Sequence, residues 1–326
     1  MNIRRRPLIA SSLALLVASG FVAAQAPAKV WRLGVLSSLS GPDQNFRVLL
    51  EGLRALGYVE GRNLSVEFRW AAGKMDRLPE LAIELALLKV DAILASTGPA
   101  AIAAKRATSS IPVVMVTVPD PVAMGLVASL GRPGGNVTGT TNMSTDLAGK
   151  SLQLLRECVP KSTRFAVLAW KGAPATPLYL ELLRSAAQVA GVTLVVQQEN
   201  QPDALAGAFA AMQQERAQAL VVQVSPFTFE HRRLTVELAA QYRLPAVFAA
   251  REFVDAGGLM SYGPNQLDLM RRAAYFVDRI FKGDKPADMP VEQATTFEIV
   301  INQKTAKALG IKFPQTVLIR AERVVE

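Results

Sequence analysis

The stretch Pro112-Val113-Val114-Met115-Val116-Thr117-Val118-Pro119-Asp120-Pro121 indicates the fold class. Its first part is apolar on both faces, as a strand is when helices cover both sides of its sheet. It ends in Pro119-Asp120-Pro121, where Asp120 fits a helix N-cap and Pro121 the first helical position. A buried strand followed at once by a helix start is typical of an α/β protein with a parallel sheet.

The same alternation of strand and helix runs along most of the chain. Apolar runs predict strands at 31–37, 63–69, 91–95 and 112–118, and again at 163–170, 192–198, 218–224 and 245–249. Amphipathic segments lie between or after them, the clearest carrying Leu78, Leu81, Leu85 and Leu88, and Leu267, Met270, Ala274, Val277 and Phe281. Such units predict parallel sheets with right-handed crossovers. Because the series occurs twice, the sequence predicts two lobes.

Three polar or glycine-rich segments interrupt this series. They are 138–146, 256–265 and 283–286. A chain that passes between two lobes only once needs fewer breaks. The extra breaks predict that the chain returns to the first lobe and then crosses to the second again.

The composition excludes several classes of protein. Of 326 residues, 50% are hydrophobic and 19% charged, so the chain can bury a core and is not intrinsically disordered. Its one cysteine, Cys158, and one histidine, His231, exclude internal disulfides and metal sites built from several of these residues. The formal net charge is +9, but the basic residues form no stripe, so we expect no nucleic-acid partner.

The N-terminus has the order of residues that an export signal has. Arg4, Arg5 and Arg6 precede an uncharged stretch from Pro7 to Ala28, which ends in small residues suited to cleavage after Ala24 or Ala26. We therefore predict a signal peptide at 1–26 and a periplasmic protein. The alternative is an uncleaved membrane anchor. No cysteine lies near the cleavage region, which excludes a cysteine-anchored lipoprotein.

Small polar residues and aromatics follow the predicted strands. In parallel sheets the loops at the carboxyl ends of the strands, and the helices that begin there, form the usual ligand site. Ser, Gly, Asp and Pro are also ordinary turn and capping residues, so each loop alone has two explanations. The same two explanations hold for Asp120. The candidates at these ends are Ser38, Thr97, Gly98, Asp120, Trp170, Ser225 and Phe227.

The sequence contains no clear reaction centre. Ser144–Ser151 falls one glycine short of a phosphate-binding loop, and the first strand is not followed by a dinucleotide fingerprint. His231 and Cys158 have no base or orienting partner visible in the sequence. An exported hydrolase using Asp120 and a serine therefore remains a weaker alternative to a binding protein, and a ligand sensor remains another.

Several segments resemble one family of binding proteins. They are 52–63, 67–73, 120–122, 132–139, 244–246, 257–263, 290–293, 297–298 and 302–310. In this order they resemble the ABC-transporter substrate-binding proteins that include tryptophan- and tyrosine-binding members. The resemblance runs from about Leu33 to the C-terminus; Ala294, Thr296 and Gln303 depart from the family pattern.

The resemblance implies a type I periplasmic-binding-protein fold, with two Rossmann-like lobes joined by three crossovers. It assigns 30–141 and 263–285 to the N-terminal lobe, and 142–262 and 286–326 to the C-terminal lobe. It implies a non-enzymatic monomer that needs neither cofactor nor metal, captures a small molecule by hinge closure and delivers it to a membrane permease. An amino acid or an aromatic or carboxylate compound is the expected ligand. By position, we expect the ligand to contact Ser38, Thr97, Gly98, Asp120, Asn142, Trp170, Ser225, Phe227, Glu252 and Tyr262.

Overall fold

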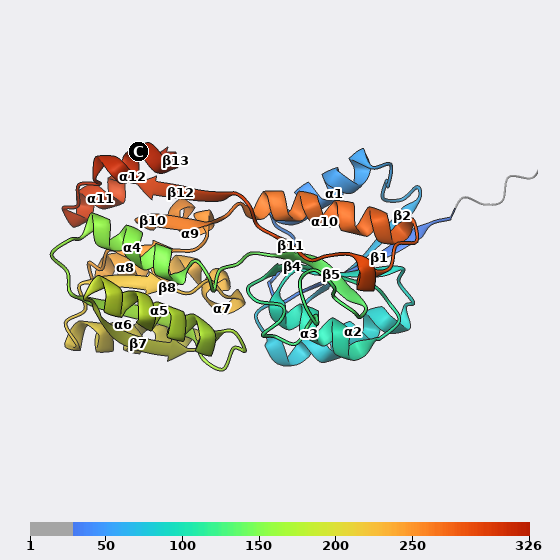
Figure 1. Ribbon diagram of the computed structural model, residues 1–326, viewed down its shortest axis with the longest axis horizontal. Coiled ribbons are helices and arrows are strands. Elements are labelled where there is room, and N and C mark those ends of the chain that lie inside the picture. The colour runs from blue at the N-terminus through green and yellow to red at the C-terminus, as the bar shows by residue number, and fades with distance from the viewer. Residues whose placement is uncertain (1–28) are drawn as a thin grey trace, which may run out of the picture.

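The protein consists of two α/β lobes placed side by side along its longest axis (Figure 1). The computed structural model describes residues 29–326, so the predicted signal peptide at 1–26 lies outside the described residues. Within 29–326, no helix combines the length and apolar character needed to cross a membrane.

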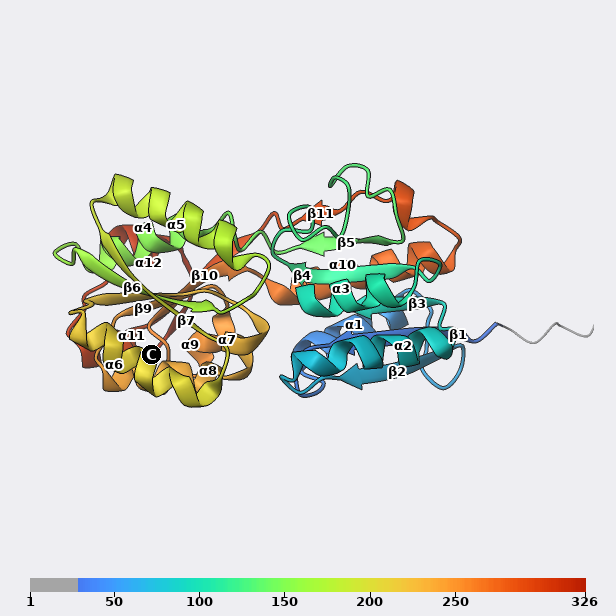
Figure 2. The same cartoon turned by 90° about the horizontal axis from the view of Figure 1, so that it is seen from below.

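The first lobe is built on a sheet with the strand order β11-β5-β4-β3-β1-β2. Its strands are β1 (Trp31–Ser37), β2 (Leu64–Trp70), β3 (Ala92–Ala95), β4 (Val113–Val118), β5 (Val137–Thr141) and β11 (Glu292–Gln293). Its helices are α1 (Gln44–Ala55), α2 (Leu78–Leu87), α3 (Gly98–Ala107) and α10 (Gln266–Phe281), with short 3₁₀ turns at Met75–Arg77 and Pro286–Asp288. One apolar core contains α1 and α10 and the other α2 and α3, so helices cover both faces of the sheet (Figure 2).

The second lobe repeats this plan with the order β13-β12-β10-β9-β8-β6-β7. Its strands are β6 (Arg164–Trp170), β7 (Thr193–Glu199), β8 (Ala219–Val222), β9 (Ala246–Phe248), β10 (Met260–Pro264), β12 (Phe297–Asn302) and β13 (Ala321–Val325). Its helices are α4 (Ala148–Cys158), α5 (Thr176–Ala190), α6 (Leu205–Gln214), α7 (Pro226–Glu230), α8 (Arg232–Gln241), α9 (Arg251–Asp255), α11 (Gln303–Leu309) and α12 (Gln315–Arg320), with a 3₁₀ turn at Pro202–Ala204. Helices α4, α5, α11 and α12 share one core, and α6 to α9 share the other. All its strand pairs are parallel except β10 with β12.

The two sheets have the same internal order, β2-β1-β3-β4-β5 in one lobe and β7-β6-β8-β9-β10 in the other. The chain passes between them three times: after β5, between β10 and α10, and between β11 and β12. These findings confirm the predicted fold class of two lobes with mainly parallel sheets joined by three crossovers.

The structure places two lobe boundaries later in the chain than the sequence analysis did. Residues 286–294 were assigned to the C-terminal lobe, but β11 pairs with Thr140 and Thr141 of β5, and Met289 and Ala294 belong to the first lobe's core. Tyr262, expected at a crossing, lies within β10 and pairs with Ile299 of β12. The glycine-rich breaks mark turns near the crossings, and hydrogen bonding then extends each sheet a few residues further.

A glycine allows the fifth strand of the first lobe to approach its neighbour. Gly139 lies in β5 opposite Met115 of β4 at φ +130°, and a Cβ there would lie 2.1 Å from the Met115 carbonyl oxygen. Gly263 has the equivalent place in β10, where a Cβ would lie 2.1 Å from the Ala249 carbonyl oxygen. Because both strands consist mainly of small and polar residues, they lack the apolar pattern that revealed the other strands.

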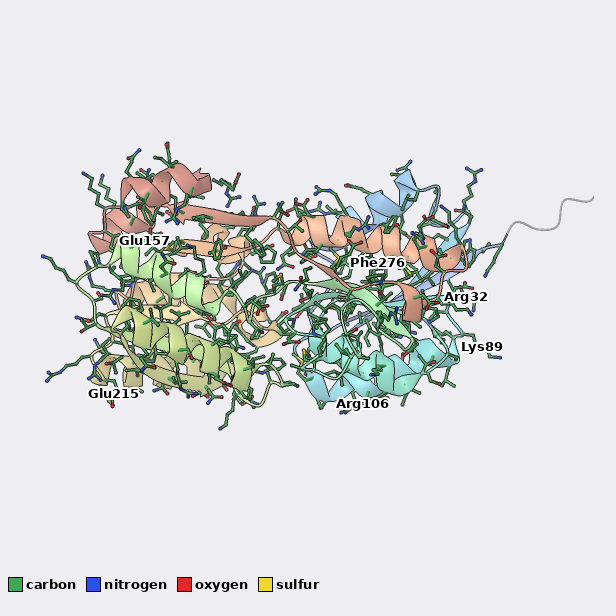
Figure 3. The ribbon with its side chains drawn as sticks, in the orientation of Figure 1. Arg32, Lys89, Arg106, Glu157, Glu215 and Phe276 are labelled. Carbon is green, nitrogen blue, oxygen red and sulfur yellow. The ribbon has the colours of Figure 1, made fainter. Side chains whose placement is uncertain are left out.

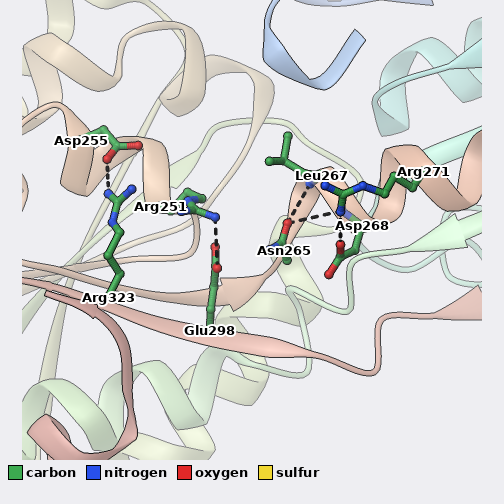
Figure 4. A network of polar contacts seen from close by, with 8 residues as sticks. All are labelled: Arg251, Asp255, Asn265, Leu267, Asp268, Arg271, Glu298 and Arg323. Atoms are coloured by element: carbon green, nitrogen blue, oxygen red, sulfur yellow. Dashed lines mark hydrogen bonds and ion pairs between the residues drawn. The ribbon is translucent and has the colours of Figure 1, made fainter. Parts of the chain in front are cut away.

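The ends of two crossings are anchored in rigid elements, as Figure 4 shows. The Asn265 side chain caps α10 by accepting hydrogen bonds from the backbone of Leu267 (3.0 Å) and Asp268 (3.3 Å). On the other side, Arg251 of α9 pairs with Glu298 of β12 at 3.3 Å. At these two crossings, relative movement of the lobes must therefore be absorbed by the few residues between the anchors.

A buried carboxylate stabilises the first lobe. Asp278 of α10, 4% exposed, accepts hydrogen bonds from the Tyr58 hydroxyl (3.0 Å) and from the Lys282 ammonium (2.9 Å). Burial, together with the neighbouring Asp278 carboxyl, raises the pKa of Tyr58 to about 12.

We predict that Tyr58→Phe lowers the free energy of unfolding by about 1–3 kcal/mol at pH 7, because it removes a donor from a buried carboxylate. The raised pKa keeps the folded phenol protonated where the unfolded one ionises, so the wild type loses this stabilisation as the pH rises from about 10 to 12. The free energy of unfolding of the Tyr58→Phe variant should fall less over that pH range. Urea unfolding at several pH values measures both effects. Tyr275→Phe, which removes a hydroxyl from an exposed contact with Arg279, is the control; equal losses in both variants would contradict the prediction.

Candidate functional site

A cavity of about 110 Å³ lies between the lobes. Since one water needs roughly 10–15 Å³ of such space, the cavity admits a small organic molecule. It is lined from the first lobe by Leu39, Asp43, Asn45, Phe46, Ser96, Thr97, Gly98, Pro99, Thr117, Pro119, Met124, Gln266 and Met270, from the first crossing by Asn142 and Ser144, and from the second lobe by Trp170, Ala173, Pro174, Ala175, Gln223, Val224, Ser225, Pro226 and Phe229. Most of these residues follow the carboxyl ends of β1, β3, β4, β6 and β8, where a parallel sheet places its ligand site.

The first lobe contributes two helix starts to the cavity. Asp43 caps α1, since its carboxylate accepts from the backbone N–H of Asn45 (2.9 Å) and from the Asn45 side-chain amide (2.9 Å). Thr97 caps α3, and its hydroxyl lies 2.7 Å from that of Ser38. Ser38 is fully buried behind Thr97 and does not line the cavity. The polar groups at this wall are therefore held in place by the caps themselves.

Thr117 reaches the cavity through an unfavourable backbone conformation. Its φ is +56°, in the left-handed region that β-branched residues avoid. Its hydroxyl donates to the Ser96 carbonyl (2.6 Å), and its own carbonyl accepts from the Asn142 side chain (3.1 Å). Local strain of this kind is held by surrounding contacts and is concentrated at binding sites.

The second lobe contributes a capped turn and aromatic surface. Ser225 and Thr228 form a reciprocal capping box at the start of α7. Trp170, the last residue of β6, and Phe229 of α7 line the cavity opposite Phe46 of α1. The walls thus combine aromatic rings with a small number of fixed polar groups, which is the usual make-up of a small-molecule site.

Three polar atoms on residues that line the cavity are buried without a hydrogen-bond partner. They are Asn45 Oδ1, Ser96 Oγ and Gln266 Oε1. Buried polar groups are nearly always paired, because an unpaired one costs about 1–3 kcal/mol. Three of the eight such atoms within 29–326 therefore belong to residues of this one cavity.

The cavity contains one charged group. Asp43 is the only ionisable residue that lines it, and within 29–326 no lysine, arginine or histidine does so. Charged side chains such as Arg32, Lys89, Glu157 and Glu215 project from the outer ends of the lobes (Figure 3). The only full charge that the lining residues offer a ligand is therefore negative.

Five of the residues predicted from the sequence line the cavity. They are Thr97, Gly98, Asn142, Trp170 and Ser225. Apart from Ser38 and Glu252, three others do not line it. Asp120 caps a turn by accepting from Val122 (3.1 Å) and Ala123 (2.9 Å), Phe227 packs in the core against His231, and Tyr262 lies in β10 near Phe297.

Glu252 of α9, the remaining predicted residue, is also not among the residues that line the cavity. Its Oε2 atom is buried without a partner, and burial raises the pKa of this carboxyl. The charge of Asp43 in the opposite lobe raises the pKa of Glu252 further. The two carboxyl groups therefore oppose each other electrostatically across the lobes.

The prediction missed Asp43, Asn45, Phe46, Gln223 and Gln266. Asp43 stands two residues after Ser38-Leu39-Ser40-Gly41, which follows the first predicted strand. The rule that ligands bind at the carboxyl ends of parallel strands could therefore have indicated it. Gln223 falls inside the apolar run predicted as a strand to 224, whereas β8 ends at Val222. Gln266 is the first residue of α10, directly after a crossing, and no local pattern marks it.

One hydrogen bond joins side chains of the two lobes. Ser40, after β1, donates to Glu230 at the end of α7. Among the side-chain hydrogen bonds and ion pairs of 29–326, no other joins an element of one lobe to an element of the other. The lobes are thus in contact beside the cavity, with little direct bonding between them.

Three known proteins resemble this chain in sequence or in structure. A tyrosine-binding protein of Clostridioides difficile (strain R20291) is 27% identical over 271 residues, which is 83% of this chain and 77% of the relative. A Streptococcus pneumonia ABC domain solved in complex with L-Trp is 27% identical, with a TM-score of 0.85, over 91% of this chain and 100% of that one. The ligand-free, open form of a substrate-binding protein with adhesive properties from Clostridium difficile is 25% identical, with a TM-score of 0.67, over 91% and 99%.

The sequence pattern of one family extends over almost all the described residues. Residues 32–325 match the family described as ABC transporter substrate binding protein. This match agrees with the two lobes, the three crossings and the interlobe cavity. The chain belongs to the ABC transporter substrate-binding protein family, whose members bind a substrate without transforming it.

Proposed function

We propose that this protein captures an aromatic amino acid in the interlobe cavity and delivers it to the permease of an ABC uptake system. The observation that carries the proposal is the set of groups lining the cavity: one carboxylate, unpartnered polar atoms and aromatic walls. An aromatic amino acid has a cationic group, several hydrogen-bonding atoms and a flat apolar side chain. Relatives named for tyrosine and solved with L-Trp give independent support.

The amino-acid head group binds at the first lobe. The ligand ammonium donates to the Asp43 carboxylate, the one charged group that lines the cavity within 29–326. The ligand carboxylate lies at the N-terminus of α3, where the Gly98 backbone N–H and the helix dipole favour an anion. The side chain then extends toward Trp170 and Phe229 of the second lobe.

Ligand capture is coupled to closure of the lobes. A ligand that contacts both walls favours the closed arrangement by its differential affinity for it. In this chain the arrangement of the lobes is nearer to that of the relative solved with L-Trp than to the open, ligand-free one, at TM-scores of 0.85 and 0.67 and similar identity. Export to the periplasm, by the signal peptide predicted at 1–26, would place the protein where such a receptor works.

A thermal-shift series on the purified protein tests the proposal. L-tyrosine, L-tryptophan and L-phenylalanine are compared with glucose and with L-glutamate, which has the head group without the ring. A ligand at one hundred times its dissociation constant stabilises the folded state by about 2.7 kcal/mol, which raises the melting temperature measurably. We expect at least one aromatic amino acid to do so. No shift with any of them, or a shift with glucose or glutamate alone, would contradict the proposal.

A further inference from the structure

Gln223 is held rigidly at the second-lobe wall of the cavity. It follows β8, and its backbone N–H donates to the Leu168 carbonyl (2.9 Å) while its carbonyl accepts from the Thr228 hydroxyl (2.7 Å). Its side-chain Oε1 accepts from the Trp170 backbone N–H (2.9 Å). The Thr176 hydroxyl lies 3.1 Å from the same oxygen. The residue is 7% exposed and lines the cavity.

These contacts determine which end of the Gln223 amide faces the ligand. A backbone N–H can only donate, so the atom that faces Trp170 must be the amide oxygen. The amide nitrogen is therefore at the other end. Within 29–326 no protein atom accepts from it, and it is not among the fully buried atoms that lack partners. It is thus presented to the cavity as a donor without an acceptor.

The part of the facing wall around Asp43 has the opposite hydrogen-bonding character. The Asn45 amide nitrogen donates to the Asp43 carboxylate (2.9 Å), which can only accept, so Asn45 Oδ1 is the other end of that amide, an acceptor that is buried without a partner. Gln266 Oε1 is another acceptor without a partner. Around Asp43 the first lobe thus carries acceptors and a negative charge, whereas Gln223 offers N–H donors from the second lobe.

We infer that Gln223 is a specificity-determining residue that selects ligands with an acceptor at the end far from the ammonium group. This inference rests on the proposed function, in which the ammonium lies at Asp43 and the side chain extends toward the second lobe. A phenol oxygen accepts a hydrogen bond from the Gln223 amide. An indole N–H only donates, so it meets a second donor and both remain unpaired. Gln223 therefore favours tyrosine over tryptophan, and over phenylalanine, which offers no acceptor.

The expected discrimination is large enough to measure. An unpaired buried donor lowers affinity by about 10- to 100-fold. We expect the wild type to bind L-tyrosine more tightly than L-phenylalanine or L-tryptophan by a factor in this range, measured by isothermal titration calorimetry. In the variant Gln223→Met, which removes the donor at similar size, the preference for tyrosine over phenylalanine should fall at least tenfold. Gln223→Glu keeps an acceptor for Trp170 and presents another to the cavity. In this variant the affinity for tryptophan should rise at least tenfold relative to the affinity for phenylalanine.

A matched control separates the role of Gln223 from effects on stability. Gln218 also has its Oε1 fixed by backbone donors, Thr163 (2.8 Å) and Arg164 (3.1 Å), but it does not line the cavity. Gln218→Glu should leave all three affinities and their ratios unchanged. Unchanged ratios in both Gln223 variants, with phenylalanine still bound, would overturn the role of Gln223 and leave the proposed function standing. If the wild type binds none of the three amino acids, both proposals fail.

Discussion

Replacing Asp43 with asparagine should weaken binding of L-tyrosine and L-tryptophan by about 30-fold or more. Within 29–326, Asp43 is the only charged residue that lines the cavity, and we propose that it pairs with the ligand ammonium. Removing one partner of a desolvated charge pair costs about 2–5 kcal/mol, at 1.4 kcal/mol for each tenfold change. Asparagine is as good an N-cap as aspartate, so α1 should keep its start. Calorimetric titration gives the affinities, and thermal unfolding without ligand checks the fold.

Asp120→Asn is the matched control for this variant. Asp120 also caps a turn through two backbone N–H groups, but it does not line the cavity. We expect its affinity for both amino acids to stay within about twofold of the wild type. Equal affinity in Asp43→Asn and in the wild type would remove Asp43 from the ligand site. A large loss in the Asp120 variant would bring that residue back into the site, as the sequence first suggested.

Replacing Gly139 with alanine should lower the free energy of unfolding by about 3–5 kcal/mol, the range reached by severe core substitutions. The new Cβ would lie 2.1 Å from the Met115 carbonyl oxygen and 2.7 Å from its amide nitrogen, so β4 and β5 must separate. The φ of +130° adds strain, because L-residues rarely adopt it. We expect the melting temperature to fall by roughly 10 °C, measured by circular dichroism or calorimetry.

Gly135→Ala serves as the comparison for this effect. Gly135 precedes the same strand, and a Cβ there would have no neighbour within 4 Å. Its melting temperature should stay within about 2 °C of the wild type, as for most exposed substitutions. A small effect of Gly139→Ala would mean that the two strands can separate at little cost, which the close register of Met115 with Gly139 argues against.

The sequence predicts a strand well where burial on both faces leaves only apolar residues. Strand β1 matches the predicted range 31–37, and β4 differs by one residue. Strand β5 was missed because its sequence, Val-Thr-Gly-Thr-Thr, has a single large apolar residue although every position is buried. Its place depends on backbone approach at Gly139, which tertiary packing alone determines. The short β11 was missed for the same reason, since only its pairing with β5 defines it.

The candidate site was predicted where local rules apply. Thr97, Trp170 and Ser225 follow strands, and the rule for the carboxyl ends of parallel strands led to each. The rule does not state which way a side chain points, so Phe227 was expected in the cavity although it packs in the core while Phe229 lines the wall. Gln266 could not be predicted, since it reaches the cavity only because the chain crosses back before α10.

The sparse bonding between Ser40 and Glu230 has a consequence for how the protein would release its cargo. No other side-chain hydrogen bond or ion pair within 29–326 joins an element of one lobe to an element of the other. A ligand that binds both walls, as we propose, therefore adds most of the polar contacts that hold the lobes together. Residence time then depends on that one exposed contact as well as on the cavity. Changes at the rim could alter the dissociation rate and leave the choice of ligand untouched, so that affinity and selectivity could evolve separately.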